Sequence, residues 1–143
     1  MKQKILFMLC IATLGLASCK KDNIIEETSN RTIIVTINPA DWEANADGST
    51  FTASMDIPEV DQLNVDIEGV LVYLAHPENP NSYIAVPNTY KGNAYSFEQY
   101  YDNANSSGIS IDLQRSEYST QNPTRPSAPI RMKVVLIPSR DVT

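Results

Sequence analysis

The chain has 143 residues, a formal net charge of -6 and only two cysteines. This length allows one domain of ordinary size, and a hydrophobic fraction of 42% excludes a disordered acidic tail. The acidic balance argues against a nucleic-acid-binding protein, which presents a face rich in lysine and arginine. Two cysteines are too few for a disulfide framework or for a zinc site built from four thiolates.

The first 18 residues have the pattern of an export signal. Lys2 and Lys4 form a basic start, and a mostly apolar run follows over residues 5–16. The run is shorter than the roughly 20 residues that a membrane-spanning helix needs. We therefore expect residues 1–18 to be a signal peptide rather than a permanent membrane-spanning anchor.

The signal ends in Leu16-Ala17-Ser18-Cys19, which resembles the lipobox of bacterial lipoproteins. In that family the chain is cleaved before the cysteine, and its sulfur and new amino group carry acyl chains. The resemblance implies that Cys19 is the first residue of the mature protein and its membrane anchor, since two or more acyl chains hold a protein firmly. It also implies a mature chain with no free thiol, and with nine basic against 17 acidic residues, a net charge of -8.

Residues 19–31 are mostly polar, and we expect them to form the lipid anchor and a flexible tether. Lys20 follows the cysteine, where an aspartate marks retention in the inner membrane in the enterobacterial sorting scheme. The resemblance therefore favours the outer membrane, and it leaves open which face of that membrane carries the domain.

Segments with β-type patterns follow the tether. Residues 32–37 are all threonine, isoleucine or valine, residues 51–57 and 109–113 alternate, and residues 65–75 become continuously apolar, which predicts a central strand buried on both faces. Further strands are predicted over residues 82–86, 95–101 and 130–137, and residues 102–108 are predicted to form a turn. About seven strands predict an all-β fold over residues 32–143, an antiparallel β-sandwich of immunoglobulin-like type, with a small closed barrel as the alternative.

The order of features over residues 34–138 resembles small lipoproteins of the Bacteroides group. An Asp-Trp pair follows the first strand, a later strand ends in Ile-Pro-Glu-Val, and the last strand reads Met-Lys-Val-Val-Leu-Ile-Pro. The resemblance supports the β-sandwich and a location in the cell envelope. The group carries no assigned reaction, so the resemblance implies no catalytic residue.

The sequence shows no catalytic or cofactor motif. His76 is the only histidine, it precedes Pro77, and no Gly-x-Ser-x-Gly motif is present. A serine triad needs only one histidine, so a small hydrolase stays open as the last alternative. One histidine and no mature thiol argue against structural zinc, and we expect no cofactor and no enzymatic activity.

Nine acidic residues and no basic residue lie between Arg31 and Lys91. Such a segment can hold Ca²⁺, which takes about six to eight oxygen ligands. Residues 43–48 are similar to the first half of an EF-hand loop, but the twelfth position is Ser54 instead of glutamate. We interpret residues 45–49 as a hairpin turn on a solvated face and leave calcium binding open.

Aromatic residues are concentrated between residues 90 and 101. On a strand, Tyr95, Phe97 and Tyr101 share one face, which predicts that Tyr95 and Phe97 pack in the core. Tyr90, Tyr100 and Tyr101 are the candidate ligand-binding residues, because exposed rings can stack on sugars. Core or cross-strand packing of these rings is the alternative.

These patterns predict a non-enzymatic, lipid-anchored envelope lipoprotein whose β-sandwich binds or scaffolds. Its expected partners are the membrane, through the lipid on Cys19, and either a glycan or another envelope protein, with no nucleic acid. One alternative is a carbohydrate-binding accessory lipoprotein of a glycan-uptake system. Another is a pilus- or adhesin-like subunit that pairs through an edge strand at residues 130–137.

Overall fold

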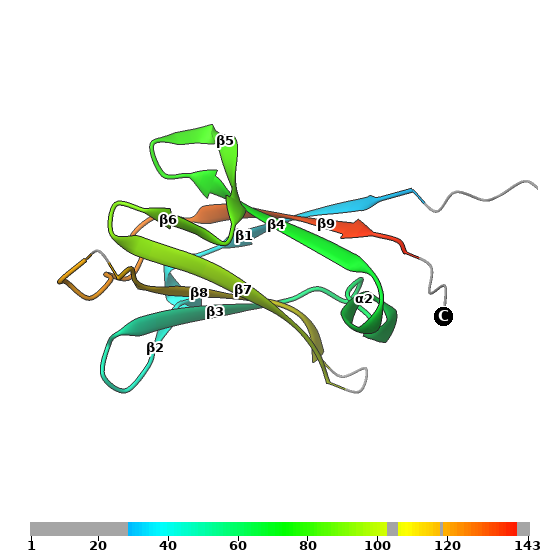
Figure 1. Ribbon diagram of the computed structural model, residues 1–143, viewed down its shortest axis with the longest axis horizontal. Coiled ribbons are helices and arrows are strands. Elements are labelled where there is room, and N and C mark those ends of the chain that lie inside the picture. The colour runs from blue at the N-terminus through cyan, green and yellow to red at the C-terminus, as the bar shows by residue number, and fades with distance from the viewer. Residues whose placement is uncertain (1–28, 103–105, 118, 140–143) are drawn as a thin grey trace, which may run out of the picture.

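The computed structural model describes residues 29–102, 106–117 and 119–139, which form two packed antiparallel β-sheets (Figure 1). The predicted all-β sandwich is confirmed. Nine strands are assigned within the described residues, rather than about seven. The two strands that the sequence did not predict are short, β2 (Glu43–Ala44) and β6 (Asn88–Tyr90).

The first sheet, called sheet A, has four strands in the order β1-β9-β4-β5. They are β1 (Arg31–Ile37), β9 (Ile130–Ile137), β4 (Gly69–His76) and β5 (Asn79–Val86). β9 pairs with β1 on one side and with β4 on the other. Residues 130–137 are therefore an inner strand, so the unpaired edge strand that would favour a pilus-like subunit does not lie at these residues.

The second sheet, called sheet B, has five strands in the order β2-β3-β8-β7-β6. Its long strands are β3 (Thr50–Asp56), β8 (Ser106–Arg115) and β7 (Asn93–Asp102). All the pairings in both sheets are antiparallel. The long strands of sheet B correspond to the alternating and aromatic segments that the sequence predicted.

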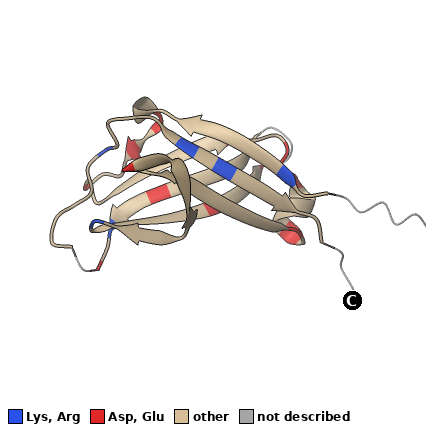
Figure 2. Ribbon diagram, turned by 90° about the horizontal axis from the view of Figure 1, so that it is seen from above, with Lys and Arg blue, Asp and Glu red and all other residues tan. Residues whose placement is uncertain are grey.

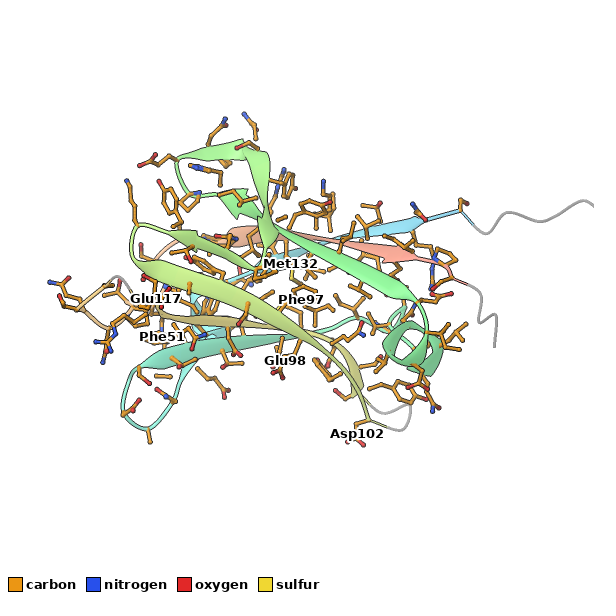
Figure 3. The ribbon with its side chains drawn as sticks, viewed as in Figure 1. Phe51, Phe97, Glu98, Asp102, Glu117 and Met132 are labelled. Carbon is orange, nitrogen blue, oxygen red and sulfur yellow. The ribbon has the colours of Figure 1, made fainter. Side chains whose placement is uncertain are left out.

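The core lies between the two sheets and follows the alternation of the strands. Ile111 of β8 and Val134 of β9 are both 0% exposed, and Phe97 and Met132 lie between the sheets in Figure 3. Tyr95 packs partly buried against the same core, as predicted for this face of β7. Because successive side chains of a strand point to opposite faces, the polar residues between the core residues lie on the outside.

A short helix replaces the first part of one predicted strand. The strand predicted over residues 65–75 begins only at Gly69, and α2 (Gln62–Asp66) precedes it. The Asp61 carboxylate accepts a hydrogen bond from the Asn64 N–H at 3.0 Å, and the Asn64 side-chain oxygen accepts one from the Asp61 N–H at 2.9 Å. This reciprocal capping supports a helix that is too short to show a helical period in the sequence.

β4 is buried on one face only, so the prediction that both its faces are buried is wrong. Val72 and Leu74 are 1% and 5% exposed, whereas Leu71 is 45% exposed. Within the described residues, the two sheets are the only layers of strands. Sheet B covers the inner face of sheet A, so no strand layer covers its outer face. A continuous apolar run does not reveal whether a second layer covers it.

The turn predicted over residues 102–108 is shorter in the structure. β7 ends at Asp102 and β8 begins at Ser106, so Gly108 lies inside β8, opposite Asp56 and Tyr100. A Cβ atom at this position would overlap the carbonyl oxygen of Met55. Glycine is therefore needed here for the close approach of two strands and not for a turn.

The two ends of the sandwich are built from different elements (Figure 1). The starts of β1 and β4 and the end of β9 lie together at the right of the figure, and we call this the tether end. The β4–β5 turn and the loop before β9 lie at the left, which we call the far end. The seven residue steps of β9 separate the two ends by about 24 Å.

Candidate functional site

An open groove of about 470 Å³ lies at the far end of the sandwich. The β4–β5 turn, the start of β7 and the loop of residues 116–129 form its walls. Its volume is in the range of about 300–1,000 Å³ that is typical of ligand pockets. The side chains in its lining that can contact a polar ligand are His76, Asn93, Tyr95, Thr124, Arg125 and Ser127.

The β4–β5 turn fixes one wall of the groove. The register of the β4–β5 pairing shifts between Ala75, which pairs with Tyr83, and His76, which pairs with Asn79. The Nδ1 atom of His76 accepts a hydrogen bond from the Glu78 N–H at 3.1 Å, so the turn itself holds the imidazole. A hydrogen bond from the Lys91 ammonium lowers the pKa of the Glu78 carboxyl, and this exposed ion pair links the turn to the β6–β7 turn.

The loop of residues 116–129 forms the opposite wall and is held against sheet B. The Ser116 N–H donates a hydrogen bond to the Gly92 carbonyl at 2.9 Å, and Pro123 is buried. The Arg125 guanidinium lies 5.9 Å from the centre of the Phe51 ring, within the range of a cation–π contact. The Arg125 side chain is exposed, so it can also reach a ligand in the groove.

Of the three candidate tyrosines, only Tyr90 lies beside the groove. Tyr90 and Tyr95 line a small cavity of about 20 Å³ that shares Tyr95 and Ile130 with the groove. The Tyr90 hydroxyl is buried, and its ring contacts His76 at a centroid distance of 5.0 Å. Burial raises the pKa of the Tyr95 phenol, so Tyr95 is a neutral part of the groove wall.

Tyr100 and Tyr101 lie elsewhere, toward the tether end of β7. The Tyr100 hydroxyl donates a hydrogen bond to Asp56 Oδ1 at 2.9 Å on the outer face of sheet B, and burial together with this bond raises the pKa of Tyr100. Tyr101 pairs with Ser107 and, as the next residue of the strand, points to the opposite face. The structure therefore does not bring Tyr90, Tyr100 and Tyr101 into one row of rings.

A different pair of tyrosines lies on the outer face of sheet A, and the sequence did not single it out. The Lys133 ammonium lies 4.5 Å from the centre of the Tyr73 ring and 4.6 Å from that of Tyr83. Arg131 donates a hydrogen bond to the Tyr83 hydroxyl at 2.9 Å. The cations lie over the rings, so both tyrosines already make cation–π contacts within the protein. The cluster becomes visible only from the pairing of β4, β5 and β9.

The segment similar to half of an EF-hand is the β2–β3 hairpin. Glu43 pairs with Thr52, and the Asn45 side-chain oxygen accepts a hydrogen bond from the Thr50 N–H at 3.0 Å. Hydrogen bonds from Ser49 lower the pKa of Asp47, so this carboxylate is held by the turn. Among the residues that the structure describes, no three His, Cys, Asp or Glu side chains are grouped closely enough to hold a metal ion.

Cys19 and the rest of residues 1–28 lie outside the described residues, so the lipobox and the boundaries at residues 18 and 31 stay predictions. In the part of the chain that the structure describes, no helix has the length and apolar character needed to span a membrane. Comparisons with protein-family models, curated proteins and solved structures found no match for this chain.

Proposed function

We propose that the protein is a lipoprotein of the cell envelope, anchored through Cys19 in the outer membrane, with a non-catalytic binding domain. The pattern Leu16-Ala17-Ser18-Cys19 after a short apolar run supports the anchor. The four- and five-stranded antiparallel sheets support a sandwich of immunoglobulin-like type. The observation that carries the binding role is the groove at the far end.

The position of the groove suits a domain that is anchored at its N-terminus. The described chain enters the sandwich at the tether end, where β1 begins, and the groove lies at the opposite end of the strands (Figure 1). A domain held by residues 19–28 therefore presents the groove away from its point of attachment. This arrangement favours capture of a ligand from the surrounding medium.

The surroundings of His76 support a binding role over catalysis. A serine triad needs a carboxylate that orients the imidazole through one ring nitrogen, while the other ring nitrogen activates the serine. In this structure the Nδ1 atom of His76 accepts the Glu78 N–H. Among the described residues, the lining of the groove contains Ser127 and includes neither Asp nor Glu.

The groove favours a carbohydrate as its ligand, which is our second and more specific candidate function. His76 and Tyr95 are ring side chains in the lining, and such rings can pack against the apolar face of a sugar. Asn93 and Arg125 add hydrogen-bond donors that suit sugar hydroxyls, and the Asn93 amide also adds an acceptor. A glycan-binding accessory lipoprotein is therefore the form of the proposal that the groove supports.

A glycan-array screen of the purified protein tests this function. We expect at least one class of glycan to bind, and the Arg125→Ala variant to bind it about tenfold more weakly or worse, since a hydrogen bond to a charged group contributes about 1.5–3 kcal/mol. Arg31→Ala is the matched control, because Arg31 is an exposed arginine at the tether end, away from the groove. The absence of any glycan signal, or an equal loss in both variants, would contradict the carbohydrate proposal.

A further inference from the structure

The large hydrophobic side chains that remain exposed are concentrated toward the tether end. Ile34 is 61% exposed, Leu63 48%, Leu71 45% and Ile67 42%. Leu63 belongs to α2, and Ile67 and Leu71 flank the start of β4. Exposed apolar residues that gather in one region mark a surface that contacts something other than water.

Ile34 and Leu71 share the outer face of sheet A with the outer residues at the end of β9, and Leu63 and Ile67 lie at the same end. Leu71 and Thr32 lie on either side of Val135, and Gly69 lies opposite Ile137. Ile34 is in the next row, opposite Lys133. We call the set the tether-end surface, and its members are Ile34, Leu63, Ile67, Leu71, Val135 and Ile137.

Hydrogen bonds tie the α2 side of this surface to the strands. The Ile67 N–H donates to the Leu63 carbonyl at 2.9 Å, which stacks these two residues one helical turn apart. The Ser139 hydroxyl donates to the Ile67 carbonyl at 2.7 Å, which joins the same segment to the chain just after β9. Leu63 and Ile67 are therefore held at the same end as Val135 and Ile137.

The charges around the surface are of both signs. Arg31 lies 4.0 Å from the carboxylate of Glu68, which is itself largely buried, and Asp66 of α2 is exposed. Figure 2, which views the molecule from the side of sheet A, shows Lys and Arg along its strands. Because cations and carboxylates are both present around the surface, its net charge does not select a strongly charged partner. The surface therefore suits a partner that offers it an apolar interior.

We propose that the tether-end surface rests on the phospholipid surface of the membrane that holds the anchor, an inference that depends on the proposed acylation of Cys19. The ten residue steps from Cys19 to Ser29 span at most about 35 Å, so the start of β1 cannot move far from the lipid. This short reach gives the apolar residues a high effective concentration at the membrane.

The residues that border the surface suit a membrane interface. Tyr73 lies in the same row as Ile34 and Lys133, and tyrosine rings are enriched at the level of lipid headgroups. The stem of Lys133 can extend along apolar groups while its ammonium stays in the headgroup region. The groove lies at the far end of β9, about 24 Å along the strand from this contact.

Site-directed fluorescence on the acylated protein tests the contact. Leu71→Cys carries an environment-sensitive dye on the tether-end surface, and Glu98→Cys carries it on the exposed outer face of sheet B as the control. In vesicles of zwitterionic phosphatidylcholine we expect a blue shift and loss of quenching by an aqueous quencher at residue 71, and neither at residue 98. Adding Ile34→Glu to the Leu71→Cys protein is expected to reduce both the blue shift and the protection from the quencher. Adding 1 M salt is expected to leave both unchanged, because the contact is apolar.

The possible results distinguish a failure of the membrane contact from a failure of the lipid anchor on Cys19. The intact mass is read first, and an unmodified Cys19 overturns the anchor itself. An acylated protein whose residue 71 is as accessible to the quencher as residue 98 overturns the membrane contact and leaves the anchor standing. Protection at residue 71 that rises with protein density in the vesicles, or that occurs without vesicles, overturns the proposal in favour of a second copy of the chain.

Discussion

Gly108→Ala is expected to cost more than about 3 kcal/mol of stability, because a single added methyl group has no room between two paired strands. The new Cβ atom would overlap the carbonyl oxygen of Met55 and lie 2.9 Å from the Ile57 nitrogen. Both obstacles are backbone atoms, so no side-chain rotation relieves the overlap. β3 and β8 would have to separate where sheet B approaches α2. Urea unfolding followed by far-ultraviolet circular dichroism measures the loss.

Gly69→Ala is the matched control for this prediction. A Cβ atom at Gly69 lies 3.5 Å from the Cβ atom of Ile137, which is an ordinary van der Waals distance. We expect the stability of this variant to stay within about 1 kcal/mol of the wild type. If both glycine variants unfold at the same urea concentration, the close approach of β3 and β8 at Gly108 is wrong.

The second large effect is expected at Trp42. This is the sole tryptophan of the chain, it is 0% exposed, and it lies between η1 (Pro39–Asp41) and β2. Trp42→Ala removes the largest fully buried side chain and leaves a cavity, which typically costs about 3–5 kcal/mol. The loss is measured as for Gly108→Ala, since circular dichroism does not depend on the indole that is removed.

Trp42→Phe distinguishes the contribution of the ring to stability from that of its N–H group. The indole nitrogen is buried and has no hydrogen-bond partner among the described residues, so phenylalanine removes an unsatisfied donor while it keeps much of the ring volume. We expect this variant to lose less than half of what Trp42→Ala loses. A Trp42→Ala protein as stable as the wild type would show that the ring does not fill the core between β1 and β3.

The parts of the fold that were predicted correctly have strong local signals. Residues 32–37 are β-branched and form β1, and the alternation at residues 109–113 places Ile109, Ile111 and Leu113 in the core. α2 was missed because five residues show no period, and its cap depends on just two side chains, Asp61 and Asn64. Gly108 was predicted to lie in a turn, because the sequence does not distinguish a turn glycine from one that allows two strands to approach closely.

The candidate site was harder to predict because it depends on which strands become neighbours. The groove combines residues near 76, 93 and 125, which come from sheet A, sheet B and the loop of residues 116–129. The aromatic segment drew attention to Tyr90, Tyr100 and Tyr101, yet Tyr90 ends β6 beside the start of β7 and Tyr100 lies near the end of β7. The apolar run of β4 did not show that Leu71 is exposed, which is the residue that tests the membrane contact.

The membrane contact and the orientation of the groove both depend on acylation of Cys19. Mass spectrometry of the N-terminal peptide, from protein purified out of bacterial membranes, tests this most directly. We expect a peptide that begins at Cys19 and carries a diacylglyceryl group on sulfur and an acyl chain on the amino group. A peptide that contains residues 1–18, or that begins at an unmodified Cys19 or at another residue, would contradict the account.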